Sequence, residues 1–217
     1  MKISLPPKPS KREVKKKTNY DRIVNAAKIA FLAQGFEATT IRDIIRQSGL
    51  APGTFYNYFP DKESVFRVIV DHYLLVLSEK LKKTRRAADS LQAYIEPTFL
   101  MFFKHIGDNS ELYCLTRRNE SALTSFYQSS LMEMIWQELI ADIEQAVVNC
   151  IIPKLDSQLL AASFIGLGHE LARLLVKEKQ HTPEEMADFA SKMFIGGLAH
   201  YQKNEDLSNH REHQIFN

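Results

Sequence analysis

Residues 39–63 read TTIRDIIRQSGLAPGTFYNYFPDKE and hold the signals of two short helices with a turn between them. Thr40 followed three residues later by Asp43 is the shorter relative of a capping box, so a helix is expected to begin here. Gly49 is a natural helix end. The residues expected to be buried on this helix, which we place at about 40–48, are Ile41, Ile44 and Ile45.

The second helix of this pair is expected at about 52–59. Pro52 suits its first position because the N–H that proline lacks would be unpaired there anyway. Phe55 and Phe59 lie one turn apart and mark the inner face. The outer face then carries small residues and hydrogen-bond donors, which are Pro52, Gly53, Thr54, Tyr56 and Asn57.

The flanking sequence completes a three-helix unit. A helical period precedes the pair at about 20–34, with Thr18 or Asn19 as its cap and Gly35 as its stop. A longer apolar period follows from Lys62, after a cap at Asp61. Two short helices packed on a longer one form a homeodomain-like helix-turn-helix, whose last helix enters the major groove of double-stranded DNA.

These residues resemble the N-terminal domain of TetR-family transcriptional regulators. The similarity covers residues 23–70 and is carried by Gly35-Phe36, by residues 39–44 and 49–59, and by Asp61-Lys62-Glu63. The resemblance implies an all-α homodimer of about nine helices, in which the DNA-binding domain precedes a helical bundle for ligand binding and dimerisation. It also implies that a small-molecule effector bound in that bundle weakens operator binding.

The resemblance also implies roles by position. Gly53 would allow close approach to the DNA backbone, and Asn57 would read base edges. Backbone phosphate contacts would come from Thr40, Thr54, Tyr56, Tyr58 and Lys62. Two alternatives without DNA contact stay open. Tyr56 and Tyr58 could be ordinary partly buried aromatic residues, and Thr40 could serve as a helix cap alone.

Two positions depart from the family pattern. Ala51 stands where Ser or Thr is common, and Pro52 stands where a basic or polar residue is frequent. The usual side-chain cap and one DNA contact are therefore missing. We expect specificity to depend more on Tyr56, Asn57 and Arg42.

Charge is distributed unevenly along the chain. Residues 1–70 hold 13 Lys and Arg against 6 Asp and Glu, whereas the remaining residues hold 15 against 20. Only the front of the chain is therefore suited to a polyanion. We divide the chain into a basic flexible arm (1–17), the DNA-binding domain (18–65), the bundle (66–203) and a flexible polar tail (204–217).

The bundle should contain the rest of the helix that starts at Lys62, followed by helices at about 90–106, 110–118, 122–150, 157–180 and 183–203. Asp156 and Thr182 are the expected caps of the last two. The basic stretch Lys80–Arg86 is interpreted as a solvated helix end, with a phosphate-bearing ligand as the alternative.

Aromatic and polar residues of the middle helices are candidates for an effector site. Most aromatic residues that recur along a helix are simply part of the core, but a subset of them could line an apolar cavity with a few polar groups. The candidates are Phe102, Phe103, His105, Tyr113, Arg117, Phe126, Tyr127 and Trp136. They favour a long-chain or aromatic hydrophobic effector, whose identity the sequence does not give.

Small residues recur on the last two helices, where glycine disfavours helix formation by about 1 kcal/mol each. They are Gly166, Gly168, Ala172, Ala190, Gly196, Gly197 and Ala199. Close packing against a second copy would compensate for this cost, and a small apolar patch within one chain is the alternative. A dimer would also hold two DNA-binding heads about 34 to 36 Å apart, as a palindromic operator requires.

Other function classes find little support. His169-Glu170 begins an H-E-x-x-H pattern, but position 173 is Arg, so a zinc protease is rejected. Two cysteines are too few for a disulfide framework or a four-ligand zinc site, and we expect no cofactor, no membrane association and a cytoplasmic location. The sequence predicts a ligand-responsive repressor, with an activator or a ligand-independent regulator of the same fold as the alternative.

Overall fold

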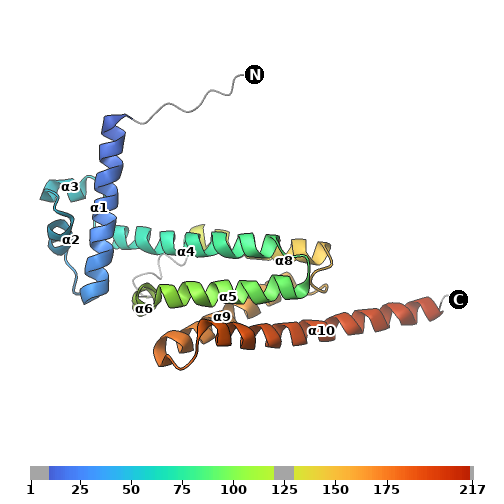
Figure 1. The fold of residues 1–217 in the computed structure, drawn as a ribbon. Helices are drawn as coiled ribbons and strands as arrows, with labels where there is room; N and C mark the ends of the chain where they lie inside the picture. Colours follow the sequence, from blue (N-terminus) through green and yellow to red (C-terminus); the bar gives the residue numbers. More distant parts are fainter. Residues whose placement is uncertain (1–9, 120–129, 216–217) are drawn as a thin grey trace, which may run out of the picture. The chain divides into compact units, whose positions relative to one another are not determined.

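The computed structural model describes residues 10–119 and 130–215, and all regular structure within these ranges is helical. The predicted all-α fold is therefore confirmed (Figure 1). The helices are α1 (Lys11–Gln34), α2 (Ile41–Ser48), α3 (Pro52–Tyr56), α4 (Lys62–Arg86), α5 (Leu91–Asp108), α6 (Ser110–Arg118), α8 (Ser130–Val148), α9 (Ser157–Glu178) and α10 (Pro183–Ile215).

The described residues form two compact units. The front unit contains the chain up to Tyr73 together with residues 115–119, and the rear unit contains residues 74–114 and 130–215. Helix α4 therefore contributes its first half to one unit and its second half to the other.

The front unit is built on a small aromatic core. Phe31 of α1, Phe36 of the following turn and Phe66 of α4 lie with ring centroids 4.7 to 5.4 Å apart, and all three are buried. Ile44 of α2 and Phe55 of α3 are also buried. Burying such side chains contributes about 1.5 to 3 kcal/mol each, so this core fixes the short helices that could not persist alone.

Both ends of the described chain differ from the expected boundaries. Helix α1 begins at Lys11 and not near residue 20, because Ser10 and Glu13 form a capping box that the sequence analysis overlooked. Residues 11–17 are therefore helical and not a flexible arm, although their side chains are exposed and the first turns of α1 project beyond α2 and α3 (Figure 1). Helix α10 continues to Ile215. The expected tail lacks proline and glycine, so no residue there interrupts the helix.

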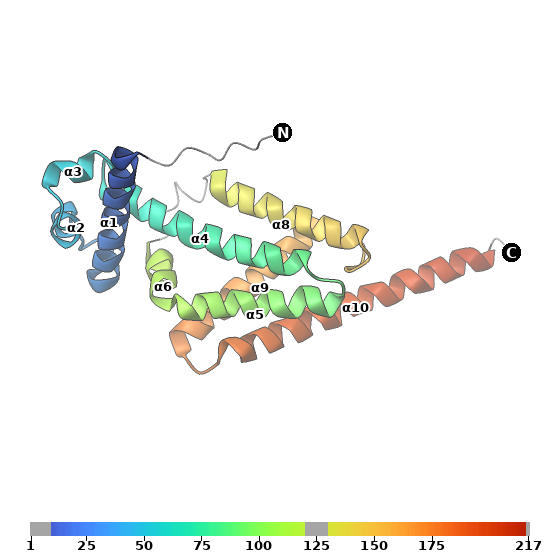
Figure 2. The same cartoon turned by 45° about the horizontal axis from the view of Figure 1, so that its top comes forward.

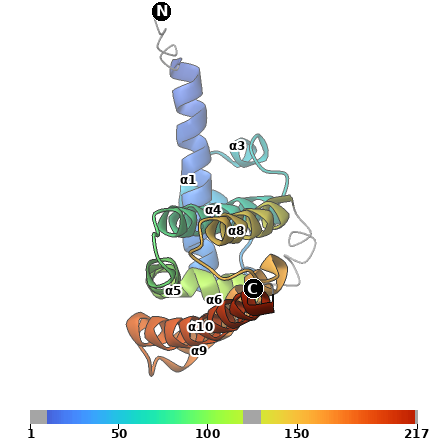
Figure 3. The same cartoon turned by 90° about the vertical axis from the view of Figure 1, so that its right-hand side faces the viewer.

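In the rear unit, α5 packs against both α9 and α10, and α8 packs against α9 (Figure 2). Buried Ile95, Phe99 and Phe103 of α5 supply much of the core, with Phe164 of α9 and Ile143 of α8. Seen from the side, α9 and α10 lie next to each other (Figure 3). The bundle therefore leaves one face of this helix pair without a neighbouring helix of the described chain.

Helix α9 is long and apolar enough, by length and composition, to cross a membrane. Its most apolar window has a mean hydropathy of 1.5, and 28% of that window is buried. The core helix of a bundle passes the same test, and α9 does pack against α5, α8 and α10. What needs an explanation is the apolar surface that stays exposed.

Candidate functional site

The turn between α2 and α3 is fixed by local hydrogen bonds. The Thr40 side chain accepts a hydrogen bond from the Asp43 backbone N–H, and the Asp43 carboxylate accepts from the Thr40 N–H, as the sequence predicted. Gly49 ends α2 in the left-handed conformation with φ of 63°. Arg22 Nη2 donates to the Ser48 carbonyl at 2.7 Å and so ties the end of α2 to α1.

The same capping box lowers the pKa of the Asp43 carboxyl group. The hydrogen bonds from the Thr40 hydroxyl and the Thr40 N–H, in that order of size, lower the pKa of Asp43 below its ordinary value. The carboxylate therefore stays ionised at neutral pH and complements the N-terminus of α2.

Helix α3 presents a polar outer face on an apolar inner face. Phe55 and Phe59 are buried, and Ala51 supplies no side-chain cap, as expected. Tyr56 leaves 59% of its surface exposed, and Asn57 is exposed beside it. An exposed tyrosine offers both an apolar ring and a hydroxyl to another molecule, and the neighbouring amide adds hydrogen-bonding groups.

Gly53 has no reason to be glycine within this chain. Its φ is not positive, and a Cβ added there would meet no atom within 4 Å. Glycine also costs about 1 kcal/mol relative to alanine in a helix. Both facts favour an external reason, namely the close approach of another molecule to the backbone of α3.

Lys62 has a structural role that the sequence analysis missed. Its ammonium group donates to the carbonyl oxygens of Phe36, Glu37 and Thr39 at 3.0, 3.2 and 3.3 Å. It also lies 4.4 Å from the centre of the Phe36 ring. All three ammonium protons are thus used inside the head, where they hold α4 to the turn before α2.

The other predicted DNA contacts lie on or near the α2–α3 surface. Thr40 and Arg42 are exposed at the start of α2, and Thr54 is half-buried on α3. Tyr58 is also half-buried, with its ring centroid 6.3 Å from that of Tyr20, so its ring is partly used for packing.

The rear unit contains an apolar cavity with a volume of about 160 Å³. Helix α4 contributes to its wall from the C-terminal half, and α5, α8 and α9 close the other sides. The residues that line it are Leu81, Arg85, Tyr94, Thr98, Phe99, Phe102, Leu139, Phe164, Ile165, Gly168 and His169. The cavity is close in size to an engineered apolar cavity of about 150 Å³ that binds benzene.

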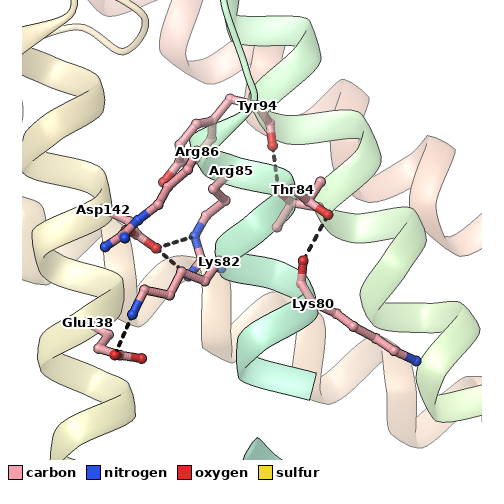
Figure 4. Close-up of polar contacts among 9 residues, drawn as sticks. Lys80, Lys82, Thr84, Arg85, Arg86, Tyr94, Glu138 and Asp142 are labelled. Carbon is pink, nitrogen blue, oxygen red and sulfur yellow. Dashed lines mark hydrogen bonds and ion pairs between the residues drawn. The ribbon is translucent and has the colours of Figure 1, made fainter. Parts of the chain in front are cut away.

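One end of this cavity carries a charged network that joins α4 to α8 (Figure 4). Arg85 Nε and Nη2 both donate to one carboxylate oxygen of Asp142, at 3.2 and 2.8 Å. Arg86 Nε donates to the other oxygen at 2.9 Å, and Lys82 pairs with Glu138 at 2.6 Å. Arg85 and Asp142 are both buried. The interpretation of the basic stretch as a solvated helix end is therefore wrong for Arg85.

Comparison with known proteins identifies the front unit. Residues 23–69 match the family model described as bacterial regulatory proteins, tetR family. The front unit therefore carries the N-terminal domain typical of tetR-family regulators.

Solved structures of such regulators share the fold over most of the chain. The fatty acid degradation regulator FadR from Bacillus halodurans superimposes with a TM-score of 0.70 at 18% identity, covering 88% of this chain and 98% of FadR. FadR from Bacillus subtilis in complex with stearoyl-CoA gives 0.68 at 15% identity, with 82% and 98% covered. A transcriptional regulator from Aquifex aeolicus gives 0.62 at 14% identity, also with 82% and 98% covered.

Of the effector contacts predicted from the sequence, only Phe102 lines this cavity. Phe103 and His105 are buried elsewhere on α5, since neighbouring helical positions face different directions. Trp136 is half-buried on α8, and the Tyr113 hydroxyl lies 3.5 Å from the His169 carbonyl oxygen. Arg117 belongs to the front unit, whereas Phe126 and Tyr127 lie outside the described residues.

Six of the seven small residues of α9 and α10 fall into two groups, and Ala199 is half-buried. Gly168, Ala172 and Ala190 are buried inside the bundle, and a Cβ on Gly168 would lie 3.4 Å from the Phe102 ring. The exposed group is Gly166, Gly196 and Gly197, with open space at each. We define the α9–α10 face as these three glycines together with the exposed apolar residues Leu159, Ile165, Phe189, Met193 and Tyr201.

Proposed function

We propose that this chain is a TetR-family regulator, namely a cytoplasmic homodimeric repressor that binds a palindromic operator and is released by a hydrophobic effector. The observation that carries the proposal is the outer face of α3, where Gly53, Tyr56 and Asn57 are exposed on a helix that Phe55 and Phe59 anchor. A helix anchored in this way can place its N-terminal residues in the major groove.

Contacts on this face divide into two kinds. Asn57 is suited to base readout, because its amide can pair with an adenine edge. Thr40, Thr54, Tyr56 and Tyr58 are suited to phosphate contacts, which position the protein without reading sequence. Arg42 is exposed and makes no ion pair among the residues described, so its guanidinium can serve either purpose.

The α9–α10 face supports a homodimer. Leu159 and Met193 leave 70% and 60% of their surfaces exposed, next to glycines that would let a second backbone approach closely. A groove of about 400 Å³ runs between the two helices and is lined by Leu159, Leu167 and Met193, among others. An isologous contact between two copies would cover this apolar surface and account for the low burial of α9.

The apolar cavity supports a hydrophobic effector. Its wall is dominated by Phe99, Phe102 and Phe164. Because α4 belongs to both units, an effector that moves the second half of α4 could alter the heads. Release requires that the effector bind the DNA-incompetent state more tightly than the DNA-bound state.

Selection of bound fragments from random-sequence DNA tests the DNA-binding part directly. The purified protein should enrich a palindrome, and its affinity should fall steeply with salt. Asn57→Ala should relax preference at a few positions, costing about 1 to 3 kcal/mol there. Gln92→Ala, at an exposed position on α5, serves as the matched control. Absence of any preference among duplexes at physiological salt would refute the proposal.

The sign of regulation needs a separate measurement. A reporter placed behind the selected operator should be silenced by the protein and released by the effector. Activation of the reporter would favour the alternative, in which the same fold recruits transcription.

A further inference from the structure

The charged end of the cavity contains a buried hydroxyl without a partner. Tyr94 of α5 lines the cavity and is 1% exposed, and its hydroxyl finds no hydrogen-bond partner within residues 10–119 and 130–215. Leaving a buried hydroxyl unpaired is unfavourable, because the hydrogen bonds it made to water are not replaced. Such a group at a cavity wall is suited to a ligand atom that accepts its proton.

Arg85 supplies further donors at the same end. A guanidinium group has five N–H donors, and the two contacts to Asp142 use one on Nε and one on Nη2. Three N–H groups are therefore left without a partner among the described residues. The side chain is only 6% exposed, so packing and the two contacts to Asp142 hold these donors in place.

The charges around this end do not cancel. Arg85 and Arg86 share the single carboxylate of Asp142, while Lys82 is matched by Glu138. One positive charge remains in excess within this network. Burial is the main reason that the pKa of Tyr94 is raised above its ordinary value, so its hydroxyl remains a donor at neutral pH. Figure 4 shows Tyr94 of α5 beside Arg85, Arg86 and Asp142.

We propose that the cavity binds an apolar monocarboxylate, whose carboxylate accepts from the Tyr94 hydroxyl and faces Arg85 while its body lies against Phe99, Phe102 and Phe164. The inference rests on the proposed effector site and adds the chemical class of its ligand. The cavity volume matches a body of about one aromatic ring, by comparison with the benzene-binding cavity of similar size.

Direct binding to the full-length protein tests this inference. The probes are 3-phenylpropanoate and octanoate, each paired with the alcohol of the same carbon skeleton. Calorimetry measures affinity, and the fluorescence of Trp136, the single tryptophan and one turn from the cavity residue Leu139, gives a second readout. At least one carboxylate should bind about tenfold or more tightly than its alcohol, as expected for hydrogen bonds to a charged group.

Tyr94→Phe removes only the unpaired hydroxyl. It should weaken carboxylate binding about ten- to a hundredfold and leave the alcohols nearly unchanged. The variant should fold at least as stably as the parent, because it removes a buried polar atom that has no partner. Tyr20→Phe, at a half-buried tyrosine of α1 outside the cavity wall, is the matched control and should bind like the parent.

The outcomes separate this inference from the proposed function. If the alcohols bind as tightly as the carboxylates, or Tyr94→Phe has no effect, the carboxylate assignment is overturned and a hydrophobic effector stands. If only the coenzyme A thioesters of these acids bind, the ligand group is a thioester carbonyl and the assignment is also overturned. If none of these probes binds while operator binding is intact, the carboxylate assignment is overturned and the DNA-binding part of the proposed function survives.

Discussion

Lys62 shows how one side chain can hold a DNA-binding head together. Its ammonium donates to three carbonyl oxygens in the turn between α1 and α2 and lies over the Phe36 ring. Charge-assisted hydrogen bonds are about twice as strong as neutral ones. The family resemblance implies a phosphate contact for the same residue, and the two roles make different predictions.

Lys62→Ala should destabilise the head by about 1 to 3 kcal/mol, because three carbonyl groups, two of them in partly buried hydrogen bonds, lose their donor. Thermal unfolding followed by circular dichroism measures this directly. Lys83→Ala, at an exposed position on α4, is the control and should change little. An unchanged melting temperature with weaker binding to every DNA sequence would instead assign Lys62 to phosphate contact.

A substitution at Gly53 should change the stability of the protein and its operator binding in opposite directions. Gly53→Ala should stabilise the protein by about 0.5 to 1 kcal/mol, since the added methyl meets no atom and alanine favours the helix. The same methyl should weaken operator binding at least tenfold if the DNA backbone approaches α3 here. Chemical denaturation and fluorescence anisotropy on the selected operator measure the two effects. Tight operator binding by the variant would remove Gly53 from the interface.

At the scale of elements, the capping box of α2 makes stability depend on pH. The pKa of Asp43 is lowered in the folded protein by hydrogen bonds from Thr40. A lowered carboxyl pKa adds stability above the unfolded pKa of about 4, and this contribution is lost as pH falls through the folded value.

Asp43→Asn should therefore be less stable than the parent at neutral pH and approach it as the pH falls through the lowered pKa of Asp43, where the parent carboxylate also loses its charge. Thermal melts of both proteins across this range give the measurement. Glu63→Gln is a control at an exposed acidic residue in the first turn of α4. A difference that persists unchanged at low pH would show that the charge of Asp43 does not contribute.

Local sequence predicted the elements whose signals are local. The boxes at Thr40 and Thr182 and the cap at Asp156 were found because each side chain bonds an N–H two or three residues away. The box at Ser10 and Glu13 has the same spacing, but the surrounding lysines and prolines favoured a disordered arm.

The candidate sites divide in the same way. The α3 face could be predicted because one short stretch provides it. Lys62 and its carbonyl partners are 23 to 26 residues apart, and Arg85 and Asp142 are 57 apart, so neither pairing has a local signal. The cavity wall depends on how four helices pack, which explains why Phe102 was found and Tyr94 was missed.

At the scale of the whole molecule, the proposed function requires a second copy of the chain. Phe189→Asp with Met193→Asp would place two charges in the α9–α10 face, where both side chains are more than half exposed in one chain. The double variant should remain folded and become monomeric, and it should bind a full operator at least a hundredfold more weakly because one head makes too few contacts.

Light scattering and binding to full and half operators measure the two effects. Val148→Asp, at a residue of α8 that is 74% exposed, is the control for adding charge to the rear unit. A double variant that stays dimeric would show that copies associate through another surface.

The missing side-chain cap at Ala51 has a further consequence for how α3 behaves before it meets a partner. This five-residue helix is held by two buried rings, and no side chain closes its first turn. Its amide protons should exchange with deuterium faster than those of α2, which is capped at both ends. Binding to DNA would then have to order α3, at a cost in conformational entropy. A substitution that caps the first turn of α3 should reduce this cost and so strengthen binding without adding a contact to DNA.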